Sequence, residues 1–145
     1  YMGSHKLNPT SEDICEGNTG HAEIIRIDYD PAEISFEDLL LVFFKTHNPT
    51  TLNRQGNDMG TQYRSVVFYE NQEQKIAAEN MIKNLQKDMV FDQPIVTEVS
   101  PVSTFYEAEN YHQDYFNNNA NKAYCVHVIQ PKLAKFTRYF WDKLK

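Results

Sequence analysis

Alternating and helical hydrophobic patterns succeed one another along most of this chain, and that order constrains the fold more than any single motif. Residues 22–29 alternate and predict a strand, and further strands are expected at 61–69 and 94–100. Helices are expected between them, at 35–47 and 71–90. With one strand and helix placed before the chain, this order predicts an α+β fold, a two-layer α/β sandwich built on a ferredoxin-like split β-α-β plait.

The expected helices have signals of their own. Ser35 is a suitable N-cap, and Asp38 occupies the capping-box position. The buried face of the first helix is expected to hold Leu39, Leu40, Val42, Phe43 and Phe44. The apolar stripe of the second is expected at Ile76, Ala77, Met81 and Leu85. Further along, the pattern predicts a short helix over 108–118, a strand over 124–129 and a helix from Pro131 to Lys145.

Length and composition indicate one globular domain over residues 1–145. Of its residues 41% are hydrophobic and 13% aromatic, as in folded proteins. The net charge of −6 is spread without a basic stripe, so nucleic acid is not an expected partner. The apolar run 39–44 is too short to span a membrane. We expect a cytoplasmic monomer, since two cysteines suit a reducing compartment and no long apolar seam is present.

Glu23 is the first candidate for acid–base chemistry. In the expected 22–29 strand it shares a face with Ile25, Ile27 and Tyr29. A carboxyl group that faces the core with them would lose hydration, which raises its pKa and keeps its proton, as a general acid requires. The alternative is that Glu23 lies at the end of the strand and turns toward water.

The segment from Asn48 to Gly60 is expected to be a long loop, and loops of this length often carry function. Residues 57–63, at the end of this loop and just after it, contain several polar groups. These are Asn57, Asp58, Gln62 and the phenol of Tyr63. Together they could form a small pocket that hydrogen-bonds an oxygen atom of a ligand. The alternative is an Asx-type turn, in which Asn57 and Asp58 bond to their own backbone.

The histidines do not predict a metal site. Glu109 and His112 have the i, i+3 spacing of a helical ligand pair, but no third ligand is suitably spaced, so we expect no metal. His21 lies two residues before Glu23 and is expected to hydrogen-bond near it.

The two cysteines have different surroundings. Cys125 lies two residues from His127, on one face of an expected strand, where an imidazolium would favour the thiolate. The alternative is a buried structural thiol. Cys15 is expected to be a poor nucleophile, because the acids around it oppose thiolate formation: Glu12, Asp13 and Glu16.

Four stretches, in order along nearly the whole chain, together resemble the A-type methionine sulfoxide reductases. They are 8–10 with 15–23, 53–65, 105–109 with 112–113, and 123–125 with 131–136. The second, Asn-Arg-Gln-Gly-Asn-Asp-Met-Gly-Thr-Gln-Tyr-Arg-Ser, is long enough to be specific.

The resemblance implies that the protein reduces the S epimer of methionine sulfoxide, free or in proteins, and so repairs oxidative damage without a bound cofactor. Glu23 would donate the proton, while Asp58 and Tyr63 hold the oxygen. The residues expected to bind substrate beside them are His21, Asn57 and Gln62. Cys125 matches a resolving position, which converts a sulfenic acid to a disulfide that thioredoxin or another dithiol reduces.

Two departures from the family pattern stand out. The Gly-Cys-Phe-Trp-Gly motif that holds the family's nucleophile does not occur in the 145 residues, so we expect it upstream of Tyr1. Ser11 stands where the family usually has tyrosine, which removes one phenol from the oxygen site. Two rival hypotheses follow: a non-catalytic relative that binds methionine-containing peptides, or an enzyme in which Cys15 or Cys125 has replaced the nucleophile.

Overall fold

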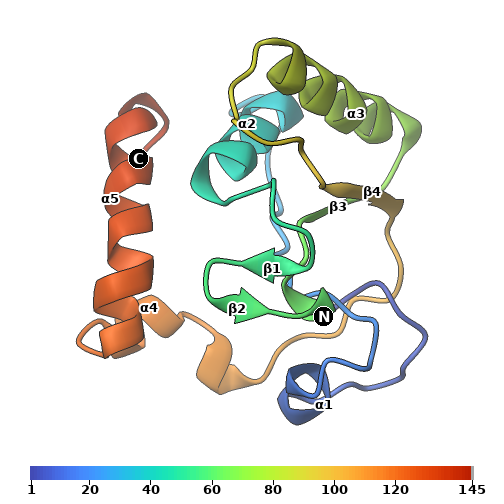
Figure 1. Cartoon of the computed structure of the whole chain (residues 1–145), viewed down its shortest axis with the longest axis vertical. Coiled ribbons are helices and arrows are strands. Elements are labelled where there is room, and N and C mark those ends of the chain that lie inside the picture. The colour runs from blue at the N-terminus through green and yellow to red at the C-terminus, as the bar shows by residue number, and fades with distance from the viewer. Residues whose placement is uncertain (145) are drawn as a thin grey trace.

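Two parallel strands, β3 (Val66–Tyr69) and β4 (Glu98–Pro101), form the central sheet of the computed structural model, which describes residues 1–144 (Figure 1). Helix α3 (Gln72–Lys87) connects them, so the three elements form a β-α-β unit. With helices over this sheet, the α+β class expected from the sequence is confirmed.

Helix α2 (Phe36–Thr46) packs against α3, and their contact contains the main hydrophobic core. The Ser35 side chain accepts a hydrogen bond from the Asp38 N–H at 3.0 Å, which confirms the predicted N-cap. The buried centre of this core is formed by Leu40, Phe44, Ala78 and Leu85. Val67 of β3 and Val99 of β4 pack against this core, which joins the two helices to the sheet.

The predicted apolar stripe of α3 is confirmed for Leu85, which is buried, and for Ala77 and Met81, which pack against the core, but not for Ile76. Ile76, expected in the core, is 49% exposed, whereas Ala78 is fully buried. Ala78, Ile82 and Leu85 recur at helical spacing and form the part of α3 that faces the core. Ile76 lies at the edge of this face.

The predicted strand at 22–29 is wrong. Only Ala22 pairs, in an isolated bridge with Met2, and residues 23–30 have no strand partner within residues 1–144. Ile25 and Ile27 are 79% and 51% exposed, and Glu23 is exposed too, so the prediction that it faces the core is also wrong. Alternation alone does not make a strand, because a strand needs a hydrogen-bonding neighbour.

The strands of the central sheet are shorter than predicted. Residues Thr61–Tyr63 form a 3-10 turn, so the strand expected at 61–69 begins only at Val66. The strand expected at 94–100 begins at Glu98. Before the turn, Gly60 has φ +144°, and a Cβ there would lie 2.1 Å from Oε1 of Gln62. Only glycine therefore allows Gln62 to fold back under the turn.

Two segments expected to be irregular contain short elements. Within 1–20, helix α1 (Ser11–Cys15) has a capping box, in which Thr10 and Asp13 exchange hydrogen bonds of 3.2 and 2.9 Å. The loop 48–60 contains a hairpin of β1 (Arg54–Gln55) and β2 (Asp58–Met59).

The predicted strand at 124–129 is wrong as well. Cys125–Ile129 is π-helical and continues into α5 (Gln130–Tyr139), with Pro131 in its first turn as expected. Cys125 is fully buried and His127 exposed, so they do not share a face, because residues two apart on a helix point in different directions.

The remaining C-terminal elements are short. The helix expected at 108–118 is split into a 3-10 turn at Asn110–His112 and α4 (Tyr115–Asn119) by Asp114, which has φ +50°. After α5, a last 3-10 turn covers Trp141–Lys143, and the predicted helix end at Lys145 lies outside the described residues. Across residues 1–144, no helix has the length and apolar character needed to cross a membrane.

Candidate active site

A backbone hydrogen bond fixes Glu23 beside the 3-10 turn that carries Tyr63. The Glu23 N–H donates to the carbonyl oxygen of Gln62 at 2.9 Å. Although part of Glu23 remains exposed to solvent, burial raises the pKa of its carboxyl group, and the carboxylate of Asp58 raises it further. The charge of His112 acts in the opposite direction. The raised pKa agrees with the prediction, and its largest cause is burial, although the side chain does not lie in the hydrophobic core.

Tyr63 is the second member of this group. Burial raises the pKa of its phenol, as do the negative charges of Glu23 and Asp58. A side-chain hydrogen bond with Gln62 lowers it in part. Tyr63 therefore remains a protonated hydrogen-bond donor at neutral pH, and it lies within electrostatic reach of Glu23 and Asp58, the two other groups expected to act on the oxygen.

Asp58 lies at the start of β2 and is held by a residue that the sequence analysis did not assign to the site. The Tyr124 hydroxyl donates to Oδ2 of Asp58 at 3.1 Å. Burial and this contact raise the pKa of Tyr124 to about 12. Tyr124 belongs to the matching stretch at 123–125, but only the folded chain brings it to Asp58, 66 positions earlier.

His112, whose charge acts on Glu23, and its neighbour Glu109 were considered in the sequence only as a metal pair. Glu109 accepts hydrogen bonds from the Ser11 N–H at 3.2 Å and from the Tyr111 hydroxyl at 2.9 Å. Nε2 of His112 lies 3.8 Å from Glu109 and 2.9 Å from the Ser11 hydroxyl. Within residues 1–144, no three His, Cys, Asp or Glu side chains gather as metal ligands.

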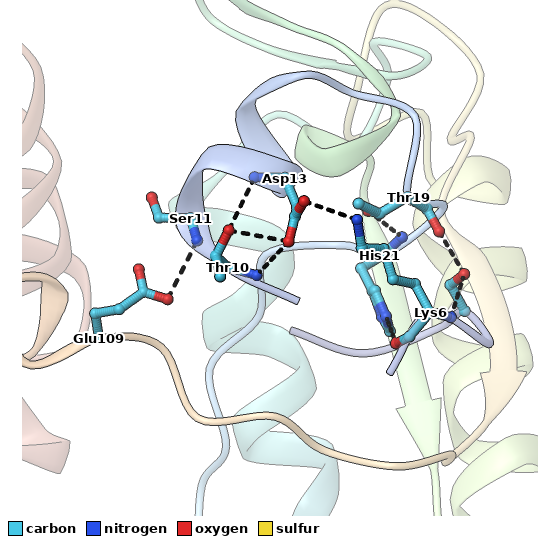
Figure 2. A network of polar contacts seen from close by, with 8 residues as sticks. Lys6, Thr10, Ser11, Asp13, Thr19, His21 and Glu109 are labelled. Atoms are coloured by element: carbon cyan, nitrogen blue, oxygen red, sulfur yellow. Dashed lines mark hydrogen bonds and ion pairs between the residues drawn. The ribbon is translucent and has the colours of Figure 1, made fainter. Parts of the chain in front are cut away.

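His21 belongs to the network of polar contacts drawn in Figure 2, together with Lys6 and Thr19. The ring atom Nε2 of His21 lies 2.9 Å from the carbonyl oxygen of Lys6. The backbone N–H of His21 donates to Oγ1 of Thr19 at 3.1 Å. The ring is fully buried and packs edge-on against Tyr106. These contacts give His21 a structural role, and its predicted contact with substrate stays a prediction.

The two predicted substrate-binding amides occupy different environments. Gln62 is buried, and its Oε1 atom has no hydrogen-bond partner among the described residues. Asn57 is exposed in the turn of the β1–β2 hairpin, next to Asp58. Asn57 is therefore accessible to a bound peptide, whereas the buried side chain of Gln62 interacts with Tyr63 by a hydrogen bond.

The two cysteines differ in exposure. Cys15 is exposed at the end of α1 and lies within electrostatic reach of Tyr63. Cys125 is fully buried at the start of the π-helical segment, directly after Tyr124. The Cys125 thiol is therefore not accessible to a partner in this structure, whereas that of Cys15 is.

The assembled groups suit the protonation of an oxygen atom. A carboxyl group with a raised pKa lies beside the turn that carries a phenol, and a second carboxylate acts electrostatically on both of them. Such a group can hold a polar oxygen and give it a proton.

Comparison with known proteins gives one consistent result. The profile of the family described as peptide methionine sulfoxide reductase matches residues 1–145. Peptide methionine sulfoxide reductase MsrA of Deinococcus radiodurans is 52% identical over 145 residues, which are 100% of this chain and 70% of that protein. MsrA of Acinetobacter baumannii (strain AYE) is also 52% identical, over 100% of this chain and 82% of its own length.

Two solved structures are similar in fold. Mxr1 from Saccharomyces cerevisiae in reduced form has a TM-score of 0.76 and 32% identity, covering 85% of this chain and 67% of that chain. Methionine sulfoxide reductase A of Corynebacterium diphtheriae has a TM-score of 0.72 and 33% identity, covering 87% and 64%. The chain thus spans about two thirds of the length of these solved chains.

Proposed function

This chain belongs to the peptide methionine sulfoxide reductase family, and from that premise we propose that Glu23, Asp58 and Tyr63 bind and protonate the oxygen of methionine sulfoxide. The family's reaction is a thiol-dependent reduction that repairs oxidised methionine. The observation that carries the proposal is the hydrogen bond from the Glu23 N–H to Gln62, which holds Glu23 beside the turn of Tyr63, where the charges of Glu23 and Asp58 raise the pKa of the phenol.

Each residue has a role that its chemistry supports. A sulfoxide oxygen is a poor leaving group, so it must gain a proton while a cysteine thiolate attacks the sulfur. Glu23 gives that proton, and Tyr63 donates a hydrogen bond to the same oxygen. Asp58, held by Tyr124, keeps the pKa of Glu23 high and accepts hydrogen bonds from the substrate. The oxygen passes to the cysteine as a sulfenic acid, so sulfoxide is reduced and the thiol oxidised.

The later steps use a second thiol. We assign Cys125 as the resolving cysteine: its thiol condenses with the sulfenic acid, releases water and forms a disulfide. The π-helical segment Cys125–Ile129 supports this role, since such segments are frequent at functional sites and open more readily than regular helix. Thioredoxin or another dithiol then reduces the disulfide by exchange.

The proposed substrate epimer follows from the family pattern, and the proposed roles of the remaining polar residues follow from their positions in the candidate active site. The S epimer is the expected substrate, free or in a peptide. Asn57 is placed to contact the substrate backbone, Gln62 supports Tyr63, and His21 keeps the segment before Glu23 in position. We further propose that the protein acts as a monomer in the cytoplasm and has no metal cofactor.

A second candidate function is the binding of methionine-containing peptides without turnover. Ser11 favours it, because the hydroxyl of Ser11 contacts His112 where the family usually supplies a tyrosine phenol. The two functions differ in one respect: a binding protein leaves the sulfoxide oxygen in place.

The pH dependence of reduction is expected to report Glu23. A general acid must hold its proton, so the rate falls as pH rises through the raised pKa of Glu23. Asp58→Asn removes a negative charge that raises this pKa, and the falling limb should move to lower pH. His112→Gln removes a charge that lowers it, and the limb should move to higher pH.

Single-turnover rates of peptide reduction across pH measure both shifts. The matched control is His127→Gln, an exposed histidine in the π-helical segment. A limb that stays at the same pH in both site variants would mean that another group supplies the proton.

A further inference from the structure

A basic cavity lies between the end of α2, the β1–β2 hairpin and α5. Its volume is about 530 Å³, within the size range of ligand sites. Three of its lining residues are lysines: Lys45, Lys132 and Lys135. Asp92 is the only acid in the lining. We call this cavity the lysine pocket.

The charges of the lysine pocket are not neutralised by the chain itself. Among residues 1–144, none of its three lysines has a carboxylate within 4.0 Å, whereas Lys6, Lys75 and Lys143 each form such a pair. The pocket is thus a concentration of free positive charge on a chain whose net charge is −6. The charge of Lys132 also lowers the pKa of His47 on the pocket wall, so its field extends across the cavity. Such a site attracts an anion.

Two elements connect the lysine pocket to the candidate active site. Gln55 lines the pocket, and its cross-strand partner in the hairpin is Asp58. Helix α5 and its π-helical start form the second connection: Tyr124 contacts Asp58, and Lys132 and Lys135 follow eight and eleven positions later. The first five of these residues, Cys125–Ile129, are π-helical and rise less per residue than the about 1.5 Å of an α-helix, so the lysines lie roughly 10 to 15 Å along the helix from Tyr124.

That separation sets the spacing of a ligand that fills both sites. An extended peptide advances about 3.3 Å per residue, so roughly three to five residues span the distance. We propose that the lysine pocket binds an acidic side chain of the oxidised substrate, roughly three to five residues from a methionine sulfoxide held at Asp58. This rests on the proposed function and adds a sequence preference to it.

The preference is testable with two peptides that differ in one feature. Both carry one methionine sulfoxide; one has glutamates, the other glutamines, at the fourth and fifth positions on each side. With the intact protein, we expect kcat/KM to be about fivefold higher for the acidic peptide, the size of two partly screened ion pairs. The difference should arise in KM, and 0.5 M salt should remove most of it.

Two double variants test whether the lysine pocket causes the preference for the acidic peptide. Lys132→Gln/Lys135→Gln should remove the preference while the glutamine peptide is still reduced at the native rate, which shows that the fold and the reaction are intact. Lys83→Gln/Lys87→Gln removes the same charge from exposed positions of α3 that do not line the pocket, and should keep the preference.

The possible failures are distinguishable. Equal kcat/KM for both peptides in the native protein, or a preference that both double variants lose equally, would overturn the lysine pocket as a substrate site. Reduction of neither peptide would instead contradict the proposed function.

Discussion

Replacing Glu23 with glutamine is expected to slow the reduction of peptide methionine sulfoxide at least about a hundredfold, the usual contribution of a general acid. Glutamine has nearly the same size and keeps a hydrogen-bond donor, but it has no proton to give to the oxygen. The raised pKa of Glu23 and its place beside Tyr63 and Asp58 are the reasons to expect so large a loss. Single-turnover rates with a dithiol reductant measure it.

Cys15→Ala is the matched comparison, because Cys15 is also exposed and also lies near Tyr63. Its rate is expected to stay within about twofold of native, since no step of the proposed reaction uses the Cys15 thiol. Equal losses in the two variants would contradict the roles given to both residues, and would support a nucleophilic Cys15.

Phe44→Ala is expected to lower the free energy of unfolding by about 3 to 5 kcal/mol, the usual cost of removing a buried phenylalanine. Phe44 is fully buried where α2 meets α3, and its loss leaves a cavity that the surrounding helices fill only in part. Denaturant unfolding followed by circular dichroism measures the change.

Ile76→Ala is the control in the neighbouring helix. The side chain is 49% exposed, so we expect a loss of about 1 kcal/mol or less, reduced further by the higher helix propensity of alanine. A loss as large as that of Phe44→Ala would place Ile76 in the core, as the hydrophobic pattern alone predicted.

The fold was predictable where local signals and packing agree. Ser35 begins α2 as expected, and β3, α3 and β4 follow in the predicted order, because caps and apolar stripes are local properties. The strands at 22–29 and 124–129 were wrong for a physical reason: alternation describes one face of a segment, but only a neighbouring strand makes it part of a sheet.

The site was predictable in part. Glu23, Asp58 and Tyr63 were identified through the family resemblance, and the structure brings them together. Tyr124 and His112 were missed as neighbours of these groups, because they reach the site only through contacts between segments far apart in the chain. The lysine pocket was missed for the same reason: Lys45 and Lys132 show no common pattern until α2 and α5 pack together.

Reduction of a peptide with one methionine sulfoxide of defined configuration tests the central claim most directly. The intact protein, a dithiol reductant and either epimer are incubated, and the peptide mass is followed. We predict that the S peptide loses one oxygen atom while the R peptide is unchanged, and that Glu23→Gln loses most of this activity. Binding of the S peptide with no loss of oxygen would contradict the account and favour a peptide-binding relative.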